Sequence, residues 1–252
     1  MLVLEYLVVL VALCCCFALA LLIPFIVGPI RMLRNSWQEA DVDYVLDDET
    51  ELPKQARRIV AELCDLGFAD LGTWLHLGGA NRATGRVALL EHPETLDVAK
   101  VLVVWTQRSA SVSLAFQTRF ADGTEAATAN NRVTAGFPAP PGITGAWLPE
   151  VRDPEQLCHI HEQLQDAIGQ GQPRVGVGSD PADYLREGSE RTHASWVATG
   201  YYRLDEECRV YRPTLKGAIL ITWRLLWPIK PLFRAWRRHQ TTRLMNRLGI
   251  EL

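Results

Sequence analysis

The sequence has little of the cysteine chemistry that stabilises small secreted domains or binds zinc. Three of its six cysteines lie together in an apolar run near the first residue. The other three are far apart in the chain, at Cys64, Cys158 and Cys208. A disulfide framework needs pairs, and a structural zinc site needs closely spaced cysteines. We therefore expect reduced thiols and no metal site.

Recognisable cofactor motifs are also missing. Gly176-Val177-Gly178 precedes a predicted helix, where a phosphate group could bind. However, the third glycine and the lysine of a phosphate loop are absent, and Asp180 and Asp183 already give this helix start a negative charge. Strands and helices do not alternate as in a Rossmann-type sheet. The sequence predicts no cofactor.

Charged residues are absent from Tyr6–Val27, a run of 22 residues. A helix of this length reaches about 33 Å, which is enough to cross the hydrocarbon core of a bilayer. Ala18-Leu19-Ala20 resembles the cleavage site of a signal peptide, which is the alternative interpretation. No lysine or arginine precedes the run, however, and the run continues for seven residues beyond that triplet. We predict an uncleaved single-pass anchor within residues 1–34.

The charges that flank this segment predict its orientation. Arg31 and Arg34 follow it, and Glu5 precedes it. Because positively charged flanks stay on the cytoplasmic side, the bulk of the chain is expected in the cytoplasm. Reduced cysteines agree with that compartment.

Charge is divided unevenly along the rest of the chain. Residues 35–208 contain 14 Lys and Arg against 27 Asp and Glu, a net charge of −13. Residues 209–252 contain 10 against one, a net charge of +9. An acidic body thus carries a basic tail, which indicates that the tail contacts something anionic.

Hydrophobic periodicity predicts an α+β domain over residues 53–174, after an acidic linker at 35–52. A helix begins at Pro53 and ends near Gly67. The period then changes to two, and Asp122-Gly123 marks a hairpin. We expect an antiparallel meander of about five strands packed with helices. The predicted strands are 72–77, 86–90, 98–106, 111–120 and 124–130.

Residues 133–150, rich in proline and glycine, are interpreted as a surface loop. Pro138 and Pro141 form a P-x-x-P that a partner protein could recognise, but a surface loop is the favoured interpretation. Two helices follow, each starting with an aspartate and a proline, and they are predicted over residues 154–168 and 181–199.

Cys158, His159 and His161 are the side chains that most resemble a reactive or metal-binding group. On a helix, residues two apart point away from each other, so His159 and His161 cannot share a metal. Cys158 and His161 do share a face. His161 also belongs to an apolar stripe, which favours a packed, hydrogen-bonded core histidine. The other members of this stripe are Leu157, Ile160, Leu164 and Ile168.

Residues 175–213 are predicted to form a helix plus a β-hairpin, which resembles the second half of a winged-helix module. The helix that would enter DNA carries three acidic residues, Asp183, Glu187 and Glu190, against Arg186 and Arg191. This charge balance suits phosphates poorly, so no contact with nucleic acid is expected.

Residues 214–252 form the basic tail. The apolar stretch Thr214–Trp227 is too short for a second membrane span and contains Arg224, and Pro228 and Pro231 interrupt it. We predict basic amphipathic helices on the membrane surface. The alternatives are packing on the acidic body or contact with a partner. The residues predicted at the interface are Trp223, Arg224, Trp227, Arg234, Trp236, Arg237 and Arg238.

The leading hypothesis for the function is a non-enzymatic interaction module, anchored in the membrane and facing the cytoplasm. Its expected partners are the lipid bilayer, the anionic membrane surface and a protein partner. The alternative is a membrane-tethered enzyme with a site in a cleft, and the third hypothesis is a membrane-tethered regulator that uses the winged-helix-like hairpin. A pocket of converging polar side chains would favour the enzyme.

Overall fold

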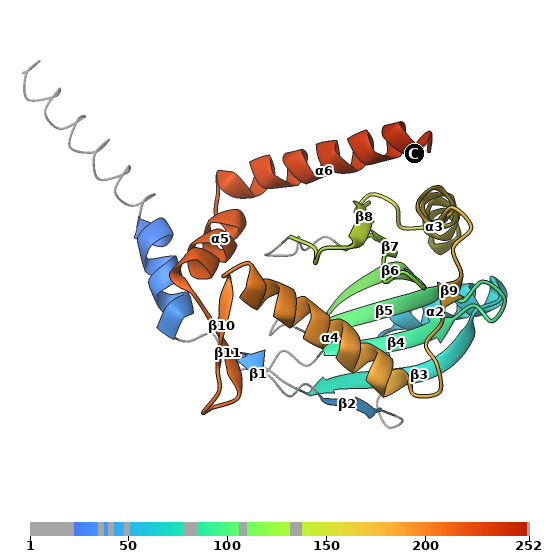
Figure 1. Ribbon diagram of the computed structural model, residues 1–252, viewed down its shortest axis with the longest axis horizontal. Coiled ribbons are helices and arrows are strands. Elements are labelled where there is room, and N and C mark those ends of the chain that lie inside the picture. The colour runs from blue at the N-terminus through green and yellow to red at the C-terminus, as the bar shows by residue number, and fades with distance from the viewer. Residues whose placement is uncertain are drawn as a thin grey trace, which may run out of the picture.

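One large sheet organises the part of the chain that the computed structural model describes, which is residues 23–34, 38–39, 43–47, 51–77, 85–105, 110–131 and 138–250. The fold is α+β, with a mostly antiparallel sheet of eight strands packed with helices (Figure 1). The strand order is β2-β3-β4-β5-β6-β7-β8, and β9 pairs with β6. These strands are β2 Asp43–Leu46, β3 Ala69–Leu77, β4 Gly85–Glu91, β5 Val98–Trp105, β6 Ala110–Phe120, β7 Glu125–Ala129, β8 Ile143–Trp147 and β9 Arg174–Val175.

The predicted meander is confirmed in strands β3 to β7. Each of these strands pairs antiparallel with the next one in the chain. The turn at Asp122-Gly123 joins β6 to β7: Asp122 accepts hydrogen bonds from the backbone and hydroxyl of Thr124, and Gly123 has a φ of +85°. Because such a φ strains residues with a Cβ, glycine is the residue that suits this turn.

Two segments that were predicted to be irregular contain strands. The acidic linker at 35–52 contains β1 (Gln38–Glu39) and β2, and the predicted loop at 133–150 contains β8. Both β2 and β8 lie at sheet edges, where β2 pairs with β3 and β8 pairs parallel with β7. Their structure comes from pairing with a strand outside the segment itself, and local composition does not encode that pairing.

The two faces of the sheet are covered by different helices. On one face, Leu114 and Phe116 of β6 pack in a core with two helices. Leu63 comes from helix α2 (Lys54–Asp65), and Leu164 comes from helix α3 (Pro154–Gly169). The opposite face carries a second core, in which Leu89 and Val98 pack with Tyr184 and Leu185 of helix α4 (Pro181–Ala198). Figure 1 shows α4 lying across the sheet on the side away from α2. Strand side chains therefore alternate between the α2–α3 face and the α4 face.

The predicted helix starts are confirmed by their caps. The Asp153 side chain accepts a hydrogen bond from the backbone of Gln156 at the start of α3. Asp180 caps α4 in the same way, accepting from Ala182 and Asp183. Each cap satisfies N–H groups that the helix itself leaves without a partner, which is why the aspartate-proline signal locates these helices in the sequence.

A small second sheet follows α4. Its strands are β10 (Tyr202–Asp205) and β11 (Val210–Pro213), which form the predicted hairpin, and β1 pairs with β11. Helix α5 (Leu215–Leu225) follows, capped by the Thr214 hydroxyl, and α6 (Ile229–Leu248) ends the described chain.

The predicted membrane span lies largely outside the described residues, because the structure describes none of residues 1–22. Residues 23–34 are helical and include the last part of that span. Across the described ranges, no helix combines the length and the apolar character needed to cross a membrane.

Helix α6 packs into the core of the body through its second half. The Met245 side chain is 0% exposed and lies in the core on the α2–α3 face. The Thr241 hydroxyl accepts a hydrogen bond from the backbone of Trp147 in β8, at 3.1 Å. In the first half, Leu232 is 67% exposed. Packing on the body, one of the alternatives for the tail, therefore holds for the second half of α6.

We predict that Met245→Ala lowers the free energy of unfolding by about 2–5 kcal/mol, because it leaves a cavity in a filled core. Leu232→Ala is the matched control on the same helix, and its effect stays within about 0.5 kcal/mol because the side chain is exposed. Urea denaturation of the full chain in detergent measures both. Similar losses of unfolding free energy in the two variants would contradict the conclusion that Met245 is buried in the core while Leu232 is exposed.

Candidate functional site

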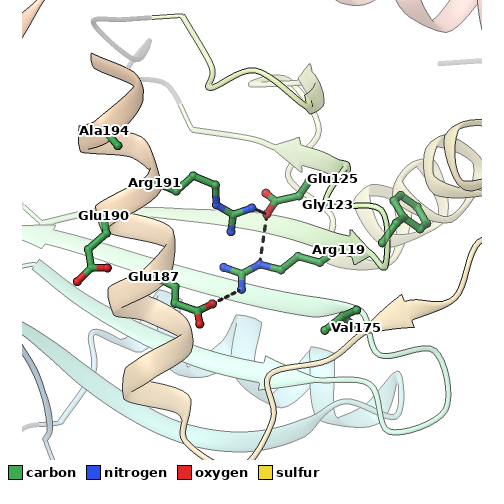
Figure 2. Close-up of a pocket in the computed structure, with 9 residues that line it drawn as sticks. Arg119, Gly123, Glu125, Val175, Glu187, Glu190, Arg191 and Ala194 are labelled. Carbon is green, nitrogen blue, oxygen red and sulfur yellow. Dashed lines mark hydrogen bonds and ion pairs between the residues drawn. The ribbon is translucent and has the colours of Figure 1, made fainter. Parts of the chain in front are cut away.

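A pocket of about 480 Å³ lies between α4 and the strands β6 and β7 (Figure 2). Helix α4 contributes two carboxylates and one guanidinium group to its wall, and the sheet contributes the rest of the charge. The lining residues are Arg119, Phe120, Gly123, Glu125, Val175, Glu187, Glu190, Arg191 and Ala194.

The hairpin between β6 and β7 places an arginine and a glutamate side by side. Arg119 of β6 is the cross-strand neighbour of Glu125 of β7, so both side chains point to the α4 face. Glu125 is 1% exposed, and Gln117, two residues before Arg119, donates a hydrogen bond to it. The Arg119 Nε lies 3.3 Å from Glu125 Oε1. A buried carboxylate is thus held on the sheet by its own hairpin.

Helix α4 adds a second arginine and a second carboxylate, one helical turn apart. Arg191 Nη1 pairs with the same oxygen of Glu125, Oε1. Glu187 accepts a hydrogen bond from Arg119 Nη1 at 3.1 Å. Figure 2 shows both guanidinium groups converging on Glu125 from different elements. Because Tyr184 and Leu185 bury the adjacent turn of α4 against the sheet, these charged groups meet at fixed positions.

Lys100 lies beneath this cluster, on the same face of the sheet. Its Nζ donates to Gln117 Oε1 at 2.6 Å and lies 4.8 Å from the centre of the Tyr184 ring. Burial, helped by repulsion from Arg119, lowers the pKa of Lys100 from 10.5 to about 7, while Glu125 opposes that shift. The amine is therefore close to half-protonated at neutral pH.

We predict that Lys100 makes stability depend on pH. Above pH 7 the unfolded chain holds a proton on Lys100 that the folded chain has released, so the free energy of unfolding rises with pH. Between pH 7 and 9 the wild type should gain about 2 kcal/mol relative to Lys100→Met, from the difference between the two pKa values. Urea denaturation at several pH values measures this. The exposed Lys54→Met is the control and should keep the wild-type slope; an unchanged slope in Lys100→Met would refute the prediction.

His161 is a packed, hydrogen-bonded histidine, as the sequence predicts. It lies on the other face of the sheet, where its Nε2 is 2.9 Å from the Thr118 hydroxyl. Asp97 and Gln165 complete a buried polar cluster around that hydroxyl. Burial lowers the pKa of His161 to about 4, so the ring is neutral at pH 7. None of these four residues lines the described pocket.

The neighbouring cysteine is not activated. Burial raises the pKa of the Cys158 thiol to about 12, and the nearby Glu162 adds to this effect. The thiol therefore stays protonated, whereas nucleophilic cysteines need a lowered pKa. Among the described residues, His, Cys, Asp and Glu side chains form no group of three that could hold a metal ion.

The residues predicted at the membrane interface divide into two groups. Trp223, Arg224 and Trp227 lie on or just after α5, next to the helical segment 23–34, and Trp227 is 69% exposed. Arg234 and Trp236 are exposed on the first half of α6.

The remaining two predicted interface residues face the body. The Arg237 guanidinium lies 5.5 Å from the centre of the Trp147 ring, and Arg238 pairs with Glu150. Both contacts join α6 to β8 and the turn after it. These arginines thus serve the attachment of α6 to the body in this structure.

Sequence reasoning missed the charged pocket. Two signals could have pointed to it: Lys100 interrupts the otherwise apolar strand VAKVLVVW, and Glu125 directly follows the hairpin turn opposite Arg119. Neither signal indicates that Arg191, distant in the chain, closes the cluster.

Comparison of the chain with family models, with curated proteins and with solved structures gives no match.

Proposed function

We propose that the chain is a membrane-anchored interaction module that faces the cytoplasm and contacts the surface of the same membrane with α5 and the first half of α6. The observation that carries this proposal is the contact between α5 and the helical segment 23–34, which continues from the charge-free run Tyr6–Val27. If that run spans a bilayer, α5 lies beside the point where the chain leaves it.

The contact between segment 23–34 and α5 is close and specific. The Trp223 indole N–H donates to the carbonyl of Phe25 at 3.0 Å, and the two rings meet edge to face with centroids 6.0 Å apart. A Cβ added at Gly28 would lie 2.2 Å from Thr222 Cγ2, so this glycine lets the two helices approach. Segments that are nearly 200 residues apart in the chain are thereby joined.

Exposed apolar side chains gather at this junction. Figure 1 shows segment 23–34 beside α5, with both near the start of α6. Single exposed apolar residues are ordinary on a protein surface, whereas many on adjoining helices indicate contact with a partner or a membrane. The exposed apolar residues of these helices are Ile23, Ile26, Val27, Ile30, Leu215, Trp223, Leu225, Trp227, Leu232 and Trp236.

Positive charge flanks these apolar residues. Arg31, Arg34, Lys230 and Arg234 are exposed on the same helices. Tryptophan favours the headgroup region, and each cation near an anionic leaflet contributes about 1 kcal/mol. Apolar residues edged by cations fit a bilayer with anionic lipids better than they fit the acidic body, which already binds the second half of α6.

The two alternative functions have weaker support. An enzyme would need the pocket at Glu125, but the guanidinium groups and carboxylates there are paired with one another, and no described nucleophile with an adjacent base lines it. A winged-helix regulator would have to present the open face of α4 to DNA, and that face carries the exposed carboxylates of Asp183 and Glu187, which suit phosphates poorly.

We predict that Leu13→Arg weakens insertion of the anchor by about 2.5–3.5 kcal/mol, because an arginine at the centre of a span must enter the hydrocarbon. Carbonate extraction of membranes measures this: the wild type stays in the membrane fraction at full length, and part of the variant is released. Release of the intact wild-type chain would rule out the anchor.

We also predict that α5 and α6 contact lipid. In nanodiscs with brominated acyl chains, tryptophan fluorescence of the full chain should be quenched, and more strongly with anionic than with neutral lipid. The double variant Trp227→Phe/Trp236→Phe should lose much of that quenching. Trp74→Phe, which removes a tryptophan of the sheet, should keep it. Equal quenching in both variants would exclude the contact while leaving the anchor intact.

A further inference from the structure

The face of α6 that turns toward the body contains one charged residue, Arg237. Residues four apart lie on the same face of a helix, and this face is formed by Phe233, Arg237, Thr241 and Met245. Thr241 and Met245 are buried, whereas Phe233 and Arg237 are half-buried. A charge that is partly removed from water in this way is normally balanced by an ion of opposite sign.

The described residues give Arg237 an aromatic ring but no carboxylate. Its guanidinium carbon lies 5.5 Å from the centre of the Trp147 ring. The carboxylate of Glu150, which also contacts α6, pairs with Arg238 instead. A ring face attracts a cation, but it supplies no full negative charge. Within the described part of the chain, the charge of Arg237 is therefore not balanced by an anion.

A second guanidinium group approaches the same face of α6 from α5. The guanidinium carbon of Arg224 lies 4.2 Å from the centre of the Phe233 ring, one helical turn before Arg237. Burial lowers the pKa of Arg237, and repulsion from Arg224 lowers it further, so the two charges are close enough to interact. An anion that contacts both arginines would replace this repulsion with attraction.

The two arginines lie at the corner where α5 and α6 meet, beside the proposed lipid contact. Trp227, within this corner, is 69% exposed, and Leu232 and Trp236 are exposed on a neighbouring face of α6. Figure 1 shows the corner close to segment 23–34. At the surface of a membrane the abundant anion is the phosphate of a lipid, and basic sites between helices at the cytoplasmic face suit such headgroups.

We propose that Arg224 and Arg237 together bind the phosphate of an anionic phospholipid headgroup. Each guanidinium group presents its donors as a planar fork, and the two forks contact different oxygens of the phosphate. Phe233 and Trp147 hold the guanidinium groups in place by stacking. The acyl chains of the lipid lie along the exposed apolar residues of the corner. This inference rests on the proposed membrane contact and adds to it a site for a single lipid.

The competing explanation is that the two arginines only fasten α6 to its neighbours through the aromatic rings. In that case, removing a guanidinium group lowers the melting temperature and leaves lipid binding unchanged. A phosphate site predicts the reverse. Without lipid, Arg237→Gln should melt within about 2 °C of the wild type, because the lost ring contact and the relieved repulsion offset each other. With lipid, the variant should lose binding.

The experiment uses the full chain in a nonionic detergent, with empty micelles as the blank. The probes are dihexanoyl phosphatidylglycerol, dihexanoyl phosphatidylcholine and inorganic phosphate. Calorimetry should show a single phosphatidylglycerol bound per chain, about tenfold more tightly than phosphatidylcholine, whose choline cation offsets the phosphate. Inorganic phosphate should also bind about tenfold more weakly, because it lacks acyl chains. Equal binding of inorganic phosphate would overturn the assignment to a lipid.

Variants test whether the two arginines form the site. Arg237→Gln and Arg224→Gln should each weaken phosphatidylglycerol binding about tenfold, since each removes one fork. Arg243→Gln is the matched control, because it removes an exposed positive charge from the second half of α6, and it should bind as the wild type does. Equal weakening in all three variants would indicate a general attraction to positive charge and overturn the site.

Failure of this site is distinguishable from failure of the proposed membrane contact. Quenching of tryptophan fluorescence by brominated lipid measures the contact of the whole corner, whereas calorimetry measures the single bound lipid. If the wild type shows quenching but no preference for phosphatidylglycerol, the site is overturned and the membrane contact stands. If quenching is also absent, both proposals are overturned.

Discussion

The structure depends on covering both faces of one sheet. Strands β4 and β5 have apolar residues on both sides, so neither side can face water, and the chain has to supply a layer for each. Helices α2 and α3 cover one face, and α4 covers the other. Because α4 is fixed by that requirement, the hairpin that follows it and then α5 take positions at one end of the sheet, beside segment 23–34 (Figure 1).

The α4 face differs from the α2–α3 face in the number of charged side chains that meet on it. On the α2–α3 face burial keeps His161 neutral and lowers its pKa to about 4, although Asp97 in the same polar cluster opposes that shift. On the α4 face Lys100, Arg119, Glu125 and Arg191 meet at the end of a pocket. Burying a charge costs free energy, and here Glu125 is paired with Arg119 of its own hairpin and with Arg191 of α4, so the cluster joins the helix to the sheet.

What the sequence predicts well is local. Aspartate caps, the Asp122-Gly123 turn and the period-two strands each act within a few residues, so the helices α3 and α4 and the meander are predicted close to their observed bounds. Strand β8 is missed because its order comes from parallel pairing with β7. The pocket is missed for the same reason: Arg191 meets Glu125 only because α4 crosses the sheet, 66 residues further along the chain. A contact set by tertiary packing leaves no periodic signal in either segment.

Helix α6 is divided between a second half that packs on the body and a first half for which we propose membrane contact. Its amphipathic pattern suggested a single membrane-facing tail, yet Thr241 and Met245 bind it to the body, and Arg238 pairs with Glu150. An exposed ion pair such as Arg238–Glu150 contributes little by itself, so the buried methionine is the stronger attachment. The first half of α6 then projects from a fixed base towards segment 23–34 and α5. In the proposed membrane contact, Trp227 and Leu232 are already exposed next to the proposed anchor, so positioning these apolar side chains would cost little further entropy.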